Sequence, residues 1–360
     1  MADRVVLHIG TMKSGTTYLQ GLLSGPVLRG SGAPAFYPGG TFGAQTKAVR
    51  GLLRPPEQRK LKAWRSLTRE TREGEGVAVW SQEFLSFAPR GRAQEIVSSF
   101  DGAPVEVVIT VRDQRRALPA QWQSFVRNRG TDTWADYLER IRRTTGGRSD
   151  RSKAVKSFRR AQDVSSIIDN WAGLEGVTGL VVVVVPPPSA PADLLWTRFC
   201  DAAGITVAAP PPDAAARANV SLGYASCDAM RRVNPQLESL GKRAFSTTRA
   251  RLLEGLLALR DQEDRPRLDR AGAELAGRLN ARIVAALDRP GVRLVGSTDE
   301  LPLGADGSAW PDRVADPDPD HVRRALEAAW STCVPGSPVP VADLEELATA
   351  LGRELVARVR

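Results

Sequence analysis

The sequence predicts an α/β protein in which helices cover both faces of a parallel β-sheet, giving three layers. Short β-branched runs alternate with helix-type patterns along most of the chain, and this alternation is typical of a parallel sheet. Residues 180–185 are apolar throughout, as in a strand with helices on both faces. The 42% hydrophobic and 25% charged residues are typical of an ordinary globular domain.

The first elements follow from local patterns. Residues 4–9 are a β-branched run that ends at Gly10, and apolar residues recur at helical spacing over 18–23. We therefore expect a strand, a loop and a helix in that order. A charged helical pattern covers 57–73, and a short apolar strand follows at 77–80.

The middle of the chain repeats this unit. Residues 105–111 are almost entirely apolar and β-branched, and 115–127 have the pattern of a helix. The strand predicted at 180–185 runs into three prolines, 186–188. After a second proline run at 210–212 the patterns become mainly helical, with breaks that are polar or rich in Pro and Gly.

The last third is predicted to be mostly helical, with one further strand at 292–295 and an acidic surface excursion at 297–320. The predicted helices cover 224–233, 246–260, 268–287, 321–333 and 341–359. We expect an α/β core over 1–225 and a C-terminal helical portion over 226–360, packed on the same domain.

Residue counts exclude several kinds of site. Only two histidines and three widely spaced cysteines are present, so a zinc site of the CxxC or HExxH type cannot form. His8 lies in a predicted buried strand, which argues against a serine hydrolase triad. The N-terminus lacks a signal-peptide pattern, and no apolar run is long enough to cross a bilayer. We expect a cytoplasmic location and no membrane span.

The charge is unevenly distributed. The formal net charge is +9, and residues 127–160 hold eleven basic against four acidic side chains. Such a stretch is either a solvated basic face or a rim that attracts an anionic ligand.

One segment has the pattern of an anion-binding loop. In residues 8–20, HIGTMKSGTTYLQ, a predicted strand runs into Gly10, and a short loop with Lys13 leads to Gly15 and a helix. Backbone N–H groups and the positive helix end would then face one spot, which suits a phosphate-like anion. A Walker A loop has lysine directly after its second glycine. Here the lysine lies two residues before Gly15.

These residues resemble the sulfotransferases that use 3′-phosphoadenosine 5′-phosphosulfate (PAPS). TMKSGTTYLQ is similar to the family's 5′-phosphosulfate loop, and residues 107–127, VVITVRDQRRALPAQWQSFVR, are similar to its 3′-phosphate segment. The likeness is greatest to a bacterial branch and covers roughly residues 1–225. It implies the sulfotransferase variant of the P-loop NTPase-like fold, with a three-layer parallel sheet.

The resemblance also implies residue roles. Lys13 matches the catalytic lysine, which balances negative charge on the leaving phosphate oxygen. Arg112 matches the arginine that holds the 3′-phosphate, and no metal is expected. The loop residues implied to bind the nucleotide with Lys13 are Thr11, Ser14, Gly15, Thr16 and Thr17.

The acceptor needs a base, for which some members of the family use histidine and others glutamate. Glu83 follows the predicted strand at 77–80, at the edge where sheet ligands bind. Glu83 is our candidate base.

The sequence departs from the family pattern at one position. Ala120 lies eight residues after Arg112, where the family usually has a serine that contacts the 3′-phosphate. Either another group replaces this serine or discrimination for the 3′-phosphate is weaker. Candidate replacements are Ser124, one helical turn later, and Arg217, Asn219 or Ser221 in a later loop.

The predicted function is transfer of a sulfonate group from PAPS to a hydroxyl or amine, with release of 3′-phosphoadenosine 5′-phosphate (PAP). The acceptor would be a small molecule or a glycan, and the basic stretch is compatible with an anionic one. We expect no nucleic-acid partner. Two alternatives remain open: a Mg-ATP-dependent P-loop kinase or NTPase, and a non-catalytic basic nucleic-acid-binding protein.

Overall fold

The computed structural model describes residues 2–25, 28, 35–207, 221–259, 265–305 and 309–359. The chain divides into two compact units. Unit 1 contains Met1–Ala117, Arg159–Asn219 and Gly277–Leu303, and unit 2 contains Leu118–Phe158, Val220–Ala276 and Gly304–Arg360. The units therefore alternate along the chain.

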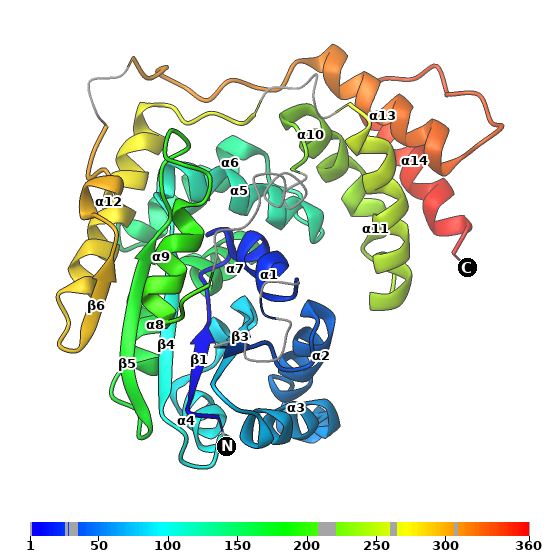
Figure 1. Cartoon of the computed structure of the whole chain (residues 1–360). Helices are drawn as coiled ribbons and strands as arrows, with labels where there is room; N and C mark the ends of the chain where they lie inside the picture. Colours follow the sequence, from blue (N-terminus) through cyan, green and yellow to red (C-terminus); the bar gives the residue numbers. More distant parts are fainter. Residues whose placement is uncertain are drawn as a thin grey trace. The chain divides into compact units, whose positions relative to one another are not determined.

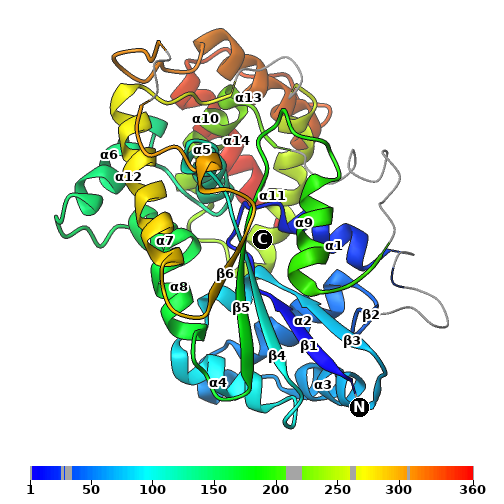
Figure 2. The same ribbon diagram turned by 60° about the vertical axis from the view of Figure 1, so that its left-hand side comes forward.

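Unit 1 contains a six-stranded sheet in which all pairings are parallel, and its order is β2-β3-β1-β4-β5-β6 (Figure 2). The strands are β1 (Arg4–His8), β2 (Ala35–Phe36), β3 (Val77–Ser81), β4 (Val105–Val111), β5 (Val177–Val184) and β6 (Val292–Val295). The α/β fold class with a parallel sheet is thereby confirmed.

Helices cover both faces of this sheet, so unit 1 has three layers (Figure 1). Side chains alternate along β1: Val5 and Leu7 belong to one core cluster and Val6 to the other. On the first face pack α2 (Phe42–Leu52), α3 (Lys62–Glu73), α4 (Arg90–Ser98), α8 (Val164–Trp171) and the second half of α12 (Arg270–Leu287). On the second face pack α1 (Thr16–Leu23) and α9 (Leu194–Ala203).

The register of the three neighbouring strands β3, β1 and β4 determines where their carboxyl ends lie. His8, the last residue of β1, is opposite Ser81 of β3 and Val108 of β4. The main chain continues this pairing past the strand, because Thr11 N donates to Thr110 O at 2.7 Å. The segments after these strands therefore start at the same edge of the sheet.

Unit 2 is helical in the residues that the structure describes. It contains α6 (Trp134–Thr145), α10 (Tyr224–Val233), α11 (Lys242–Leu257), α13 (Pro319–Cys333), α14 (Leu344–Ala357) and parts of α5 (Gln114–Arg127) and α7 (Lys153–Gln162). Helices α11 and α13 approach closely, because a Cβ added at Gly255 would lie 2.7 Å from Ala329 Cα. The Trp122 ring lies 5.7 Å from the Trp134 ring and 5.6 Å from the Tyr224 ring.

The strand predictions at 4–9, 77–80, 105–111 and 292–295 are confirmed to within one residue, whereas β5 starts three residues earlier than predicted. Helix α11 begins four residues before its predicted start. The sequence patterns did not predict the two-residue strand β2 or the helices α2, α4, α6, α7, α8 and α9. Among the described helices, none combines the length and apolar character of a membrane-crossing segment.

Candidate functional site

Three predicted site segments follow the adjacent strands β3, β1 and β4. Glu83 comes two residues after β3, the loop that contains Lys13 follows β1, and Arg112 directly follows β4. Because the strands are parallel and their order is β3-β1-β4, the loop with Lys13 starts between Glu83 and Arg112 at the carboxyl edge. This is the edge at which ligands bind in open α/β sheets.

The loop between β1 and α1 has an unusual backbone. Gly10, Lys13 and Gly15 have φ angles of 67°, 65° and 81°, in the left-handed region that costs a non-glycine residue energy. Left-handed residues in a short loop turn successive N–H groups to one concave side. Gly15 is the N-cap of α1 and has no side chain that could accept a hydrogen bond from the first turn. This geometry suits an anion at the helix start.

Side chains from outside the loop hold its main-chain carbonyls. Arg112 Nη1 donates to Lys13 O at 3.2 Å, and Gln162 Nε2 donates to Met12 O at 2.6 Å. Because each peptide unit is planar and trans, fixing a carbonyl also fixes the direction of the following N–H. The N–H groups of Lys13 and Ser14 are thereby oriented by Gln162 and Arg112.

Thr11, at the start of the loop, has a buried hydroxyl oxygen without a hydrogen-bond partner among the described residues. Buried polar atoms are rarely left unsatisfied in proteins. A ligand oxygen or a water molecule would complete this group. The hydroxyl of Thr11, the cationic Lys13 and the N-terminus of α1 are together compatible with a bound phosphate or sulfate group.

Glu83 lies against the start of the same loop. A Cβ added at Gly10 would lie 3.1 Å from Glu83 Cβ, so only glycine lets the two segments approach this closely. Gln20 Nε2 donates to Glu83 Oε2 at 2.7 Å and to Ser81 O at 3.2 Å. The Glu83 side chain is half-buried, and its carboxylate is oriented by a side chain from α1.

The other predicted nucleotide-binding residues lie elsewhere in the chain. Ser124, on α5, and Ser221, just before α10, belong to unit 2, whereas Arg112 and the loop belong to unit 1. Arg217 lies outside the described residues. Trp80 and Trp122, which are close in sequence to the predicted site, are completely buried and form part of the cores.

Several polar residues that support the loop were not predicted. Gln114 Nε2 donates to Gln162 Oε1 at 3.0 Å, and Asn280 Nδ2 donates to Asp113 Oδ1 at 2.8 Å. Asn280 Oδ1 also accepts the Gln114 N–H at 2.9 Å. These residues lie far apart in the sequence and form no motif, so no local pattern could have identified them.

The basic stretch at 127–160 is partly used in local structure. Arg140 pairs with Asp132 at 3.0 Å, and two arginines of α6 pair with Glu139. Lys153 Nζ donates to the main-chain carbonyls of Asn128 and Arg129 at 2.7 and 2.8 Å, at the end of α5. Such contacts favour the interpretation that part of this charge stabilises helices.

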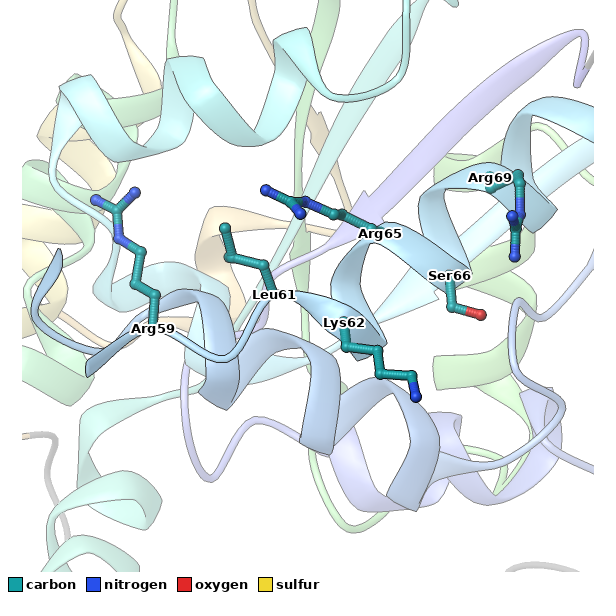
Figure 3. A pocket seen from close by; sticks show the side chains of 6 residues that line it. All are labelled: Arg59, Leu61, Lys62, Arg65, Ser66 and Arg69. Atoms are coloured by element: carbon teal, nitrogen blue, oxygen red, sulfur yellow. The ribbon is translucent and has the colours of Figure 1, made fainter. Parts of the chain in front are cut away.

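A separate basic groove lies along α3 and the residues just before it. Figure 3 shows the side chains that line it, and none of the predicted site residues is among them. The groove has a volume of about 560 Å³. Its lining residues are Arg59, Leu61, Lys62, Arg65, Ser66 and Arg69.

Comparison with known proteins found no matching family model, no matching curated protein and no matching solved structure. The fold and the geometry of the loop therefore carry the functional argument, together with the resemblance of the loop sequence.

Proposed function

We propose that this protein is a PAPS-dependent sulfotransferase. The observation that carries the proposal is the Gly10–Gly15 loop, in which a left-handed lysine lies between two left-handed glycines just before helix α1. Two further predicted residues, Glu83 and Arg112, contact or adjoin this loop. The motif resemblance then selects a phosphosulfate group as the anion.

The described residues fit such a nucleotide. The loop N–H groups, Lys13 and the Thr11 hydroxyl would hold the 5′-phosphosulfate, and Arg112 would hold the 3′-phosphate through a charge-assisted hydrogen bond. PAPS would supply the sulfonate group, which leaves the phosphate oxygen as the acceptor oxygen or nitrogen bonds to sulfur. Lys13 would balance the negative charge that develops on the leaving oxygen.

Glu83 would remove the acceptor proton. Gln20 donates a hydrogen bond to Glu83 Oε2 at 2.7 Å, and the remaining lone pairs of the carboxylate would be available to accept the proton. A base must lie within hydrogen-bond reach of its proton in a defined orientation. The contact with Gln20 supports this assignment, because it fixes the carboxylate. The acceptor would be a hydroxyl or amine on a small molecule or a glycan.

The test is thermal stabilisation of the purified chain by PAP, compared with adenosine 5′-phosphosulfate, ADP and Mg-ATP. A ligand at 100 times its dissociation constant stabilises the folded state by about 2.7 kcal/mol. We expect PAP to stabilise the protein without added metal, and Lys13→Ala and Arg112→Ala to weaken this effect. Stabilisation by Mg-ATP but not PAP would favour the kinase or NTPase alternative instead.

Arg90→Ala is a matched control for Arg112→Ala. Arg90 Nη1 also donates to main-chain carbonyls, of Asp169 and Ala172, both at 2.8 Å. It lies at the start of α4, which follows η3 (Glu83–Phe87), and contacts α8 and the turn after it. Equal loss of PAP binding in both variants would mean that Arg112 acts only through folding.

Binding that is steeply salt-dependent and equal for PAP and nucleic acid would favour the nucleic-acid alternative.

A further inference from the structure

A chain of buried hydrogen bonds crosses the sheet beneath the loop. His8 Nδ1 lies 2.7 Å from Ser81 Oγ, and His8 Nε2 lies 3.1 Å from Thr110 Oγ1. Thr110 Oγ1 lies 2.6 Å from Ser14 Oγ, and Ser14 Oγ donates to Thr11 O at 2.5 Å. All four side chains are completely buried. The chain thus connects β3, β1 and β4 to the centre of the loop.

Counting hydrogens determines the direction of each bond. A hydroxyl has one hydrogen to donate, and a neutral imidazole donates from one nitrogen and accepts at the other. Ser14 uses its hydrogen on Thr11 O, so Thr110 must donate to Ser14. His8 Nε2 must then donate to Thr110, and Ser81 must donate to His8 Nδ1. Each hydrogen is used once, and His8 is the neutral Nε2–H tautomer.

We propose that His8 is a positioning residue, which holds the anion-binding loop in place through Thr110 and Ser14. Ser14 lies between Lys13 and Gly15, two of the three left-handed residues that shape the loop. The hydrogen bond from Thr110 to Ser14 therefore also restricts the backbone of Lys13 and Gly15. This role in ligand binding rests on the proposed function, whereas the hydrogen-bond chain itself does not.

Because these side chains are buried, the loss of one hydrogen bond in this network affects the stability of the loop. A buried hydroxyl that loses its hydrogen-bond partner destabilises the fold around it, because water does not replace the bond. The edge of the His8 ring also packs against Phe199 at 5.2 Å between centroids, which holds the imidazole on the side of α9. The ring therefore has a fixed orientation from which both nitrogens reach their hydroxyl partners.

The first test reads the tautomer directly. Nitrogen-15 NMR of the imidazoles is simple in this chain, which has only two histidines, and His321→Gln assigns the signals. We expect His8 to show a protonated Nε2 and an unprotonated Nδ1, with no titration between about pH 5 and 8. A His8 signal that titrates in that range, or a protonated Nδ1, would contradict the hydrogen-bond directions assigned to His8.

The second test measures the order of the loop in the absence of a ligand. Met12 lies in the loop and is one of three methionines, so its carbon-13 methyl signal reports the order of the loop, and Met12→Leu assigns it. Thr110→Val removes the hydroxyl with little change in shape. We expect this variant to shift or broaden the Met12 signal and to leave Met230, in unit 2, unchanged. Thr110→Ser should restore the Met12 signal.

The third test reads ligand binding at a temperature where all variants are folded. We expect Thr110→Val to raise the dissociation constant for PAP at least about tenfold, and Thr110→Ser to recover most of the loss. Thr68→Val is the control, because the buried Thr68 hydroxyl bonds only main-chain carbonyls of its own helix.

The outcomes separate the two proposals. An unchanged Met12 signal with unchanged PAP affinity in Thr110→Val would overturn the positioning role. A changed Met12 signal in a protein whose wild type binds no PAP would contradict the sulfotransferase proposal, and the positioning role would stand.

Discussion

Gln20 Nε2 donates one hydrogen bond to Glu83 Oε2 at 2.7 Å and a second to Ser81 O at 3.2 Å. The carboxamide thereby joins the first helix to the segment after β3. Gln20 is almost completely buried, so water cannot easily take over its role. This contact gives Glu83 one orientation relative to the loop.

Replacing Gln20 with methionine should reduce catalysis more than binding. The change keeps the length of the side chain but removes the donor to Glu83. We expect kcat for sulfonate transfer to fall about tenfold, because a misoriented base loses part of its contribution, while the PAP dissociation constant stays within about twofold. Steady-state kinetics measure kcat, and calorimetry measures the PAP dissociation constant. Gln94→Met, on α4, is the control, and an unchanged kcat in Gln20→Met would contradict the role of Glu83 as an oriented base.

Lys13 should combine a strained backbone with an essential charge. Its φ of 65° costs a non-glycine residue about 1–2 kcal/mol. Lys13→Gly and Lys13→Ala both remove the ammonium group, but only glycine relieves the strain. We expect both variants to lose sulfonate transfer. The free energy of unfolding of Lys13→Gly should be about 1 kcal/mol higher than that of Lys13→Ala. Equal stabilities in urea titrations would show that the backbone at this position is not strained.

Gly15 should not tolerate a side chain. A Cβ there would lie 2.5 Å from Leu195 Cδ2, and the φ of 81° is unfavourable for alanine. We expect Gly15→Ala to lower the free energy of unfolding by about 1–3 kcal/mol. Gly21→Ala, in the same helix and with open space around its Cβ, should instead raise it by about 0.5–1 kcal/mol. The prediction would be wrong if the two variants changed stability in the same direction.

Stability should fall in mild acid because of His8. Burial lowers the pKa of His8 from 6.5 to about 3. Between these values the unfolded chain binds a proton that the folded chain does not, so the free energy of unfolding decreases as the pH falls. The loss at pH 5 is about 2 kcal/mol relative to pH 7. Urea unfolding of the wild type and His8→Gln at both pH values measures it, since the variant lacks this contribution.

Asn234 should stabilise unit 2. Its Nδ2 donates to Val126 O at 2.9 Å and to Gly130 O at 2.7 Å, and the side chain is buried. Asn234→Ala leaves both carbonyls without this donor, so we expect a loss of about 2 kcal/mol in the free energy of unfolding. Asn128→Ala, at an exposed position, should change it by less than about 1 kcal/mol. A loss of similar size in both variants would contradict the role of the buried bonds.

Local patterns predicted those parts of the molecule whose signal is contiguous in the sequence. The strands at 4–9 and 105–111 are unbroken apolar runs, and burial on both faces of a parallel sheet requires such runs. Strand β2 has only two residues, too few to produce a period. Helices α4 and α9 are short, and short apolar patterns do not distinguish a helix from other structure.

The loop at 10–17 could be recognised from the sequence because its glycines, its lysine and the helix start are neighbours in the chain. The contacts that hold it could not. His8 and Thr110 are 102 residues apart, and Gln20 and Glu83 are 63 apart. These pairs meet because the sheet places β1 between β3 and β4. The sequence alone identified the candidate loop at 10–17, whereas strand order decided its supporting contacts, since hydrogen bonds depend on distance in space.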